Sequence, residues 1–238
     1  MKLKLILLVL ACSALCTAQQ HDEKPGEERE LLVTQFSISG VPAIQGLLEL
    51  SRSESVPLGI VVDGDRLCKT QVSYSGSNVP LSFVVKSIVG QVPGYSWERG
   101  QDSPVLLVTP VSVRPATEQF LNIVDHRYGP MKANLQTLAL TLWVHIRYVL
   151  YPDQGTAGSI LSSKDDREFE LEARDATVRQ ILDRMAALAK GTWVLRPLPP
   201  TLAKLAGDLP FAIFSSFGQV GSDLGGLCST EAEQPARK

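Results

Sequence analysis

The sequence contains few of the residues from which catalytic and metal sites are built. In 238 residues there are three histidines and four cysteines, and no Cys-x-x-Cys spacing, glycine-rich phosphate loop or nucleophile elbow is present. The formal net charge of −2 provides no positive field to attract nucleic acid. We therefore expect a protein that is not an enzyme, holds no cofactor or metal ion and does not bind nucleic acid.

Long apolar runs are also missing, because the one near the N-terminus, residues 5–10, is too short to span a bilayer. Hydrophobic residues make up 44% and charged residues 20% of the chain, which is typical of a globular protein. This composition excludes a coiled coil, a collagen-like chain and wholesale disorder. A globular chain of this length predicts two small modules.

The N-terminus has the pattern of a secretory signal peptide. Two early lysines precede the apolar run and small residues follow it, with cleavage expected after Ala18. We therefore expect residues 1–18 to be a signal peptide and the protein to be periplasmic or secreted. The alternative is a lipid-anchored lipoprotein acylated at Cys12, and only in that case do we expect contact with a membrane.

Two cysteines, Cys68 and Cys228, lie outside the expected signal peptide. In an oxidising compartment they are candidates for a disulfide. The other interpretation is a half-buried Cys68 thiol and an unpaired Cys228 in the C-terminal segment. The sequence does not decide between the two.

Residues 31–110 alternate between strand and helix patterns in the order β-α-β-β-α-β-β. Asn78 is the expected N-cap of the second helix, and Gly94 is its expected stop. Residues 19–30 are nearly all charged and predict a solvated leader. The expected strands are 31–39, 58–62, 70–75, 95–98 and 105–109, and the expected helices are 42–51 and 79–91.

A shift of the chain by 97 residues places the closing half of this module on a second stretch with the same pattern. Asn78 falls on Asp175 and Gly94 falls on Gly191, and the apolar positions between them coincide. The sequence therefore predicts an α+β protein with two tandem β-α-β-β-α-β modules. The expected divisions are a first module at 31–110, a linker at 111–118, a second module at 119–198 and a low-complexity tail at 199–238.

The opening half of the second module is less regular. Residues 120–125 are expected to form a strand and residues 134–149 a helix with a broad apolar stripe. The segment 143–151 also alternates and is rich in β-branched and aromatic residues, so a strand is the alternative there.

Several segments of the first module together form a recognisable pattern: Phe36-Ser37-Ile38, Pro42, the helix at 44–50, the run 58–62, the stretch 72–80 that leads into the second helix, and Gly94-Tyr95-Ser96-Trp97. With this pattern the first module resembles the short N-terminal domain of secretins and TonB-dependent receptors. The residues that carry the resemblance span 31–109, and a second copy over 120–196 is weaker. Such domains imply non-enzymatic protein contact in the bacterial envelope, here as an accessory to a secretin or TonB-linked system. The outer-membrane channel is then expected to be a separate protein and a partner.

The closing strand of the first module is the predicted partner-binding edge. Prolines flank it on both sides, which is typical of a strand at the edge of a sheet. Such an edge has free backbone groups that can accept a partner strand. The residues concerned are Val105, Leu106, Leu107, Val108 and Thr109.

The sequence leaves two other functions open. A ligand-binding sensor would place Trp97, Trp143 or Trp193 in a cleft between the modules. An enzyme would require Asp125 and His126 to converge with a further polar group, although neighbours on a strand point to opposite faces. His145 is expected at the surface, and Asp63-Gly64-Asp65 is expected to be a turn and not a calcium site.

Overall fold

The computed structural model describes residues 30–100, 103–150, 167–197, 211–216 and 228. The expected signal peptide and nearly all of the charged leader lie outside the described residues. Contacts divide the chain into two units, Met1–Leu31 and Leu32–Lys238, and all the described helices and strands belong to the second. None of the described helices is long and apolar enough to cross a membrane.

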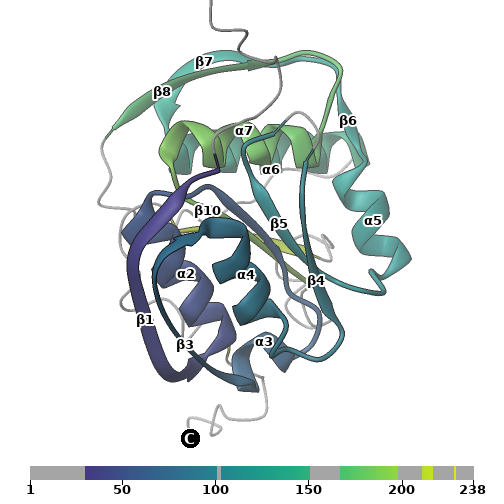
Figure 1. Ribbon diagram of the computed structural model, residues 1–238. Helices are drawn as coiled ribbons and strands as arrows, with labels where there is room; N and C mark the ends of the chain where they lie inside the picture. The colour runs from purple at the N-terminus through teal and green to yellow at the C-terminus, as the bar shows by residue number, and fades with distance from the viewer. Residues whose placement is uncertain (1–29, 101–102, 151–166, 198–210, 217–227, 229–238) are drawn as a thin grey trace, which may run out of the picture. The chain divides into compact units, whose positions relative to one another are not determined.

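The fold is α+β, and the first half of the unit has the predicted order of elements (Figure 1). A short helix, α3, is the one unexpected addition. Asn78 was predicted to be the N-cap of the second helix, and this prediction was wrong. Asn78 lies in a strand with φ of 54°, and the helix begins three residues later. The elements are β1 (Leu32–Pro42), α2 (Ala43–Glu54), β2 (Leu58–Val61), α3 (Arg66–Lys69), β3 (Gln71–Pro80), α4 (Leu81–Val89), β4 (Tyr95–Arg99) and β5 (Leu106–Pro110).

The second half departs from the prediction in two places. The expected linker and first strand overlap helix α5, which starts at a proline suited to a first helical turn. Part of the expected tail forms a strand, β11. The elements are α5 (Pro115–Leu121), β6 (Val124–Asp125), β7 (Tyr128–Asn134), α6 (Leu135–Leu150), β8 (Glu168–Ala173), β9 (Ala176–Thr177), α7 (Val178–Ala189), β10 (Thr192–Pro197) and β11 (Phe211–Ser216).

Helix α6 resolves the ambiguity at residues 143–151, of which 143–150 are helical. Its buried residues recur every three or four positions and face one core, as a helical period requires. The strand alternative was wrong because residues 143–150 continue this helix. The residues are Leu135, Leu138, Leu142 and Ile146.

The 97-residue shift also relates the element boundaries. It carries the start of β3 to Glu168, where β8 begins, and the start of α4 to Val178, where α7 begins. Asn78 and Asp175 correspond, and both have positive φ. Helix α7 has the capping box that α4 lacks, formed by Thr177 and Gln180.

The central sheet has five strands in the order β11-β10-β2-β5-β4. Strands β10, β2 and β5 are parallel to one another, and the two outer strands are antiparallel to their neighbours. Strand β10 pairs with β2 from Thr192↔Leu58 to Leu195↔Val61. The two halves of the chain therefore share the central sheet.

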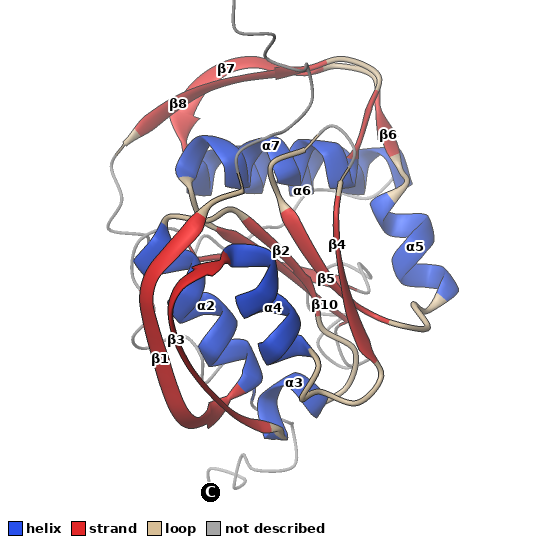
Figure 2. Cartoon of the chain, viewed as in Figure 1, coloured by secondary structure: helices blue, strands red, loops and turns tan. Residues whose placement is uncertain are grey.

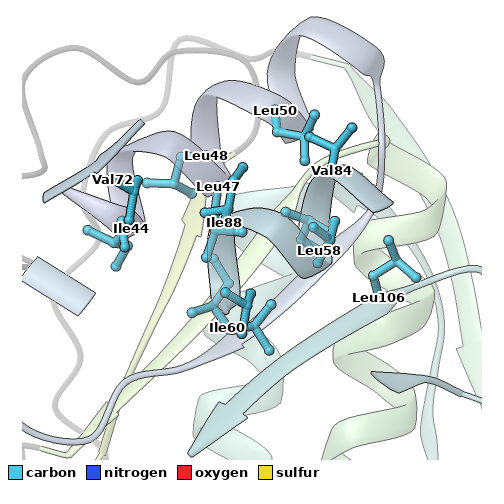
Figure 3. Packing of buried hydrophobic residues seen from close by; sticks show 14 of the residues in the cluster. Ile44, Leu47, Leu48, Leu50, Leu58, Ile60, Val72, Val84, Ile88 and Leu106 are labelled. Carbon is cyan, nitrogen blue, oxygen red and sulfur yellow. The ribbon is translucent and has the colours of Figure 1, made fainter. Parts of the chain in front are cut away.

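A layer of helices and a two-stranded ribbon lie on each face of this sheet, and Figure 2 shows both ribbons. Ribbon one (β1 and β3) packs on α2 and α4, and ribbon two (β7 and β8) packs on α6 and α7. Alternate residues of β2 enter the two cores: Leu58 and Ile60 join the first, whereas Val61 joins the second. Figure 3 shows Leu58 and Ile60 packed among side chains of α2 and α4.

Buried polar contacts connect the two halves within the core. The Thr192 hydroxyl donates to Ser51 Oγ (2.7 Å), and Ser51 Oγ donates to the Val56 carbonyl oxygen (2.6 Å). Trp193 is fully buried, and its Nε1 donates to Asp183 Oδ1 at 2.8 Å. Its ring occupies the space where a Cβ at Gly59 would lie, so this close approach of β10 to β2 requires glycine.

Candidate functional site

The predicted partner-binding edge at residues 105–109 was wrong. Strand β5 lies inside the sheet, with β2 on one side and β4 on the other. The side chains from Val105 to Val108 are all buried. The flanking prolines therefore mark the two ends of a central strand, because a proline at a strand end removes no ladder hydrogen bond.

The outer edge of the sheet next to β5 is β4. Val111 N donates to Gly94 O (2.8 Å), and the alternation of an antiparallel pair then directs the Trp97 backbone groups away from β5. Glu98 and Arg99 are charged residues on this strand, and Arg179 Nη2 lies 3.0 Å from Glu98 Oε1. Charged side chains on an edge strand oppose the addition of another strand.

Ribbon one has no such protection. Strand β1 has 11 residues (LVTQFSISGVP) and β3 has 10 (QVSYSGSNVP), and none of these residues is charged. The strands pair only with each other within the described residues. Long strands with open edges normally carry charges or prolines along the edge, and here the two prolines, Pro42 and Pro80, stand only at the strand ends.

The ribbon is amphipathic. Phe36, Ile38 and Val72 are buried against the helices, and the Phe36 and Tyr74 rings lie 6.3 Å apart. The other face has exposed hydroxyl and amide side chains, including Ser37 and Ser75. Burial of one face holds the ribbon on α2 and α4, and no described strand pairs with its outer edges.

A side chain shows which backbone groups point outward. The Gln91 amide pairs with the Ser73 backbone, accepting from Ser73 N (3.2 Å) and donating to Ser73 O (3.1 Å). One residue of an added antiparallel strand would form the same two bonds through its own C=O and N–H. Because directions alternate along a strand, the backbones of Ser75 and Ser77 also point outward from β3, and those of their partners Ser37 and Gln35 point outward from β1.

Ribbon two has the same pairing with a different chemistry. Lys132 lies on β7, and its Nζ is 3.5 Å from Glu168 Oε2 on β8. Strand β8 carries two further acidic residues, Glu170 and Glu172, and Arg174 Nε donates to Glu172 at 2.8 Å. This ribbon is therefore charged along its length.

A polar cavity of about 400 Å³ lies at one end of the central sheet. Arg114 Nη2 is 2.6 Å from Asp63 Oδ1, and the Tyr95 hydroxyl accepts a hydrogen bond from Asp63 N at 2.9 Å. Burial raises the pKa of Tyr95 above its usual value. The cavity is lined by Asp63, Gly64, Asp65, Arg66, Gly94, Tyr95, Pro110, Val111, Ser112 and Arg114.

This cavity is not the tryptophan-lined cleft that the sensor hypothesis required. Trp193 lies in the second core, Trp97 packs against the first core, and Trp143 packs against the second. The segment Asp63-Gly64-Asp65 is the turn that follows β2, with Gly64 at φ of 72°. Across the described part of the chain, no group of three His, Cys, Asp or Glu side chains has the arrangement of a metal site.

Asp125 and His126 do not converge. Asp125 is buried and lies 3.0 Å from His145 Nδ1, and it also accepts a hydrogen bond from Arg127 N at 2.8 Å. His126 instead contacts Asp175 at the surface, at 2.7 Å. The Asp125–His145 contact joins β6 to α6 and was missed because it connects two segments with no local pattern in common.

His145 is held by an aromatic contact in addition to its contact with Asp125. Its ring meets the edge of Tyr128 with centroids 5.8 Å apart, and the Tyr128 hydroxyl donates to the Leu138 carbonyl oxygen. Burial raises the pKa of Tyr128. Among the described residues, no hydroxyl or thiol side chain hydrogen-bonds to His145.

Cys68 and Cys228 form a disulfide, with their Cα atoms 5.5 Å apart. The bond joins α3 to a residue 160 positions later. Both side chains pack against the first core. The alternative of an unpaired Cys228 is therefore excluded.

No family model, curated protein or solved structure matches this chain. The resemblance to the short N-terminal domain of secretins and TonB-dependent receptors therefore stays a prediction.

Proposed function

We propose that this protein is a non-enzymatic, exported protein-interaction module of the bacterial envelope, which binds an extended segment of a partner protein along the edge of β1. The observation that carries this proposal is the uncharged, open edge of ribbon one. The partner is a component of a secretin or TonB-linked system, as the resemblance of residues 31–109 implies.

Strand addition suits this edge for a physical reason. An added strand forms backbone hydrogen bonds, each of which contributes about 1 kcal/mol net, and the edge of β1 offers outward groups at Gln35 and Ser37. The edge of β3 is already occupied at Ser73 by the Gln91 amide. We therefore assign the partner to β1.

The partner segment is expected to be uncharged. A charged side chain beside the central residues of β1 would lose water without gaining an opposite charge, because neither strand of the ribbon has one to offer. The disulfide between Cys68 and Cys228 supports export, because such bonds persist in oxidising compartments.

The test compares the two edges of the ribbon. A photo-cross-linking residue at position 37 is expected to capture an envelope protein in cells, whereas the same residue at position 75 is not. Ser37→Pro removes an outward N–H without removing a ladder bond, so it is expected to weaken binding of the captured partner about tenfold or more.

Ser75→Pro is the matched control, because Ser75 faces Ser37 across the ribbon and directs its N–H to the opposite edge. The purified variants are compared by calorimetry with the captured partner. Capture of no protein from position 37, or equal affinity of Ser37→Pro and the wild type, would falsify the proposal.

A further inference from the structure

The polar cavity lies where the chain leaves two neighbouring parallel strands in opposite directions. After β2 the chain enters α3, whose Leu67 belongs to the first core. After β5 it enters α5, whose Phe120 belongs to the second core. Where the chain leaves two paired parallel strands toward opposite faces of the sheet, a crevice forms at the carboxyl ends of the strands. Ligands of α/β sheets bind in such crevices.

The walls of the crevice are fixed by specific contacts. The Tyr95 hydroxyl holds the backbone of Asp63 through Asp63 N at 2.9 Å. Arg66 Nη1 donates to the Pro93 carbonyl oxygen at 3.3 Å, and its guanidinium lies where a Cβ at Gly94 would be. Gly94 has φ of 79°, so glycine satisfies both the backbone and the close approach.

Among the charged side chains of the crevice, the cation Arg66 has no ion pair with a described residue. Asp65 is paired with Lys69 at 2.5 Å, and this hydrogen bond lowers the pKa of the Asp65 carboxyl. Asp63 is paired with Arg114. Arg66 forms no ion pair with any described residue, and its one hydrogen bond is to a neutral carbonyl. Among the described residues, the crevice therefore has a positive charge that no carboxylate in contact with it neutralises.

Asp63 provides a second unmatched group. Its Oδ1 is buried and accepts no hydrogen bond of good geometry, although Arg114 Nη2 lies only 2.6 Å away. The two observations agree if the guanidinium neutralises the carboxylate without directing an N–H at this oxygen. A buried oxygen of this kind is stabilised by a hydrogen-bond donor.

We propose that this crevice binds a small molecule with an anionic oxygen group next to a hydrogen-bond donor, with the anion on Arg66 and the donor on Asp63. A free α-amino acid is the simplest molecule with both groups. The volume of about 400 Å³ is in the range of small-ligand sites. The crevice shares no residue with the edge of β1, so it is independent of strand binding.

The test uses glycine, acetate, methylammonium and inorganic phosphate as probes, added to the ¹⁵N-labelled, oxidised protein. Glycine is expected to shift the amide signals of Gly64, Gly94 and Ser112 saturably. Its affinity is expected to exceed that of acetate, methylammonium and phosphate by about tenfold, because only glycine has both an anionic oxygen group for Arg66 and an N–H donor for Asp63 Oδ1.

Two variants assign the groups. Arg66→Ala is expected to weaken glycine binding about tenfold, and Asp63→Asn is expected to bring glycine and acetate to similar affinities. Arg52→Ala is the matched control, since Arg52 is also exposed but belongs to α2 and pairs with Glu49. Arg66→Lys keeps the charge and is used if Arg66→Ala does not fold.

Three results would overturn the proposal. They are the absence of saturable shifts with every probe, acetate or phosphate binding as tightly as glycine, and equal weakening by Arg52→Ala and Arg66→Ala. The last result would identify a general charge effect and not a site.

Discussion

Ribbon one and ribbon two are built to the same plan, but their edges differ in charge. In each ribbon the first strand leads directly into a helix, and a glycine with positive φ marks an irregularity in the pairing, Gly40 in one and Gly129 in the other. Ribbon one has no charged residue, whereas ribbon two has Lys132 and three glutamates.

The two ribbons show that packing on the helices depends on apolar side chains and not on charge. Both ribbons cover a pair of helices through buried apolar side chains, so charge on the outer face is not required for packing. It is also tolerated, as ribbon two shows. The absence of charge from ribbon one therefore has no structural cause in the ribbon itself, and we attribute it to binding at its edge.

The largest expected effect separates the two glycines. A Cβ at Gly129 would overlap the Leu171 backbone, whereas a Cβ at Gly40 would meet open space. Gly129→Ala is therefore expected to lower the free energy of unfolding by about 3 kcal/mol, from a clash added to an unfavourable φ. Gly40→Ala is expected to lose about 1 kcal/mol from the backbone alone. Urea unfolding measures both, and equal losses would show that the ribbons are not held as described.

A smaller effect is expected from exchanging the charges. Ser37→Lys gives ribbon one the protection of ribbon two, and we expect it to weaken partner binding about tenfold while stability changes by less than about 0.5 kcal/mol. The reverse change, Lys132→Thr with Glu170→Thr, removes the charged pair that faces across ribbon two. Sedimentation velocity is expected to show new, concentration-dependent association. Unchanged partner binding by Ser37→Lys, together with no association of the Lys132→Thr, Glu170→Thr variant, would show that charge at these edges does not control strand addition.

Much of the fold was predictable from local patterns. The apolar stripe of α6 repeats every three or four residues, and the 97-residue shift located α7 and β10 because burial and turn positions coincide in both halves. Asn78 misled the prediction because the same residue type suits an N-cap and a strand position with positive φ.

The position of the open edge was not predictable, because it depends on distant pairing. Strand β2 lies between β5 and β10, and β10 follows it by more than one hundred residues. An alternating or apolar strand has the same pattern whether it is central or at an edge. The cavity and the Asp125–His145 contact were missed for the same reason, since each joins segments that are separate in sequence.

The smallest expected effect concerns the helix under ribbon two. Burial raises the pKa of Asp183 above 3.8, and the hydrogen bond from Trp193 only partly opposes this. The folded state therefore binds the Asp183 proton more tightly than the unfolded state does. The stabilisation that this provides at low pH is lost as the pH rises from the unfolded pKa through the folded one.

Asp183→Asn keeps an oxygen for Trp193 Nε1 and removes the charge. At pH 7 it is expected to raise the free energy of unfolding by about 0.5 kcal/mol and to flatten its decrease with pH above 3.8. Lys86, the position of ribbon one's helix that corresponds to Asp183, is exposed, and Lys86→Gln is the control with no such change. A loss of stability at pH 7 in Asp183→Asn would contradict this assignment.

Whether a partner strand pairs with β1 can be measured by amide hydrogen exchange. In a complex of the wild-type protein with the captured partner, we expect the amides of Gln35 and Ser37 to exchange at least about a hundredfold more slowly than in the free protein. The amides of Ser75 and Ser77, on the opposite edge, are predicted to exchange at unchanged rates. Unchanged exchange at Gln35 and Ser37 in a saturated complex would contradict the pairing of a partner strand with β1.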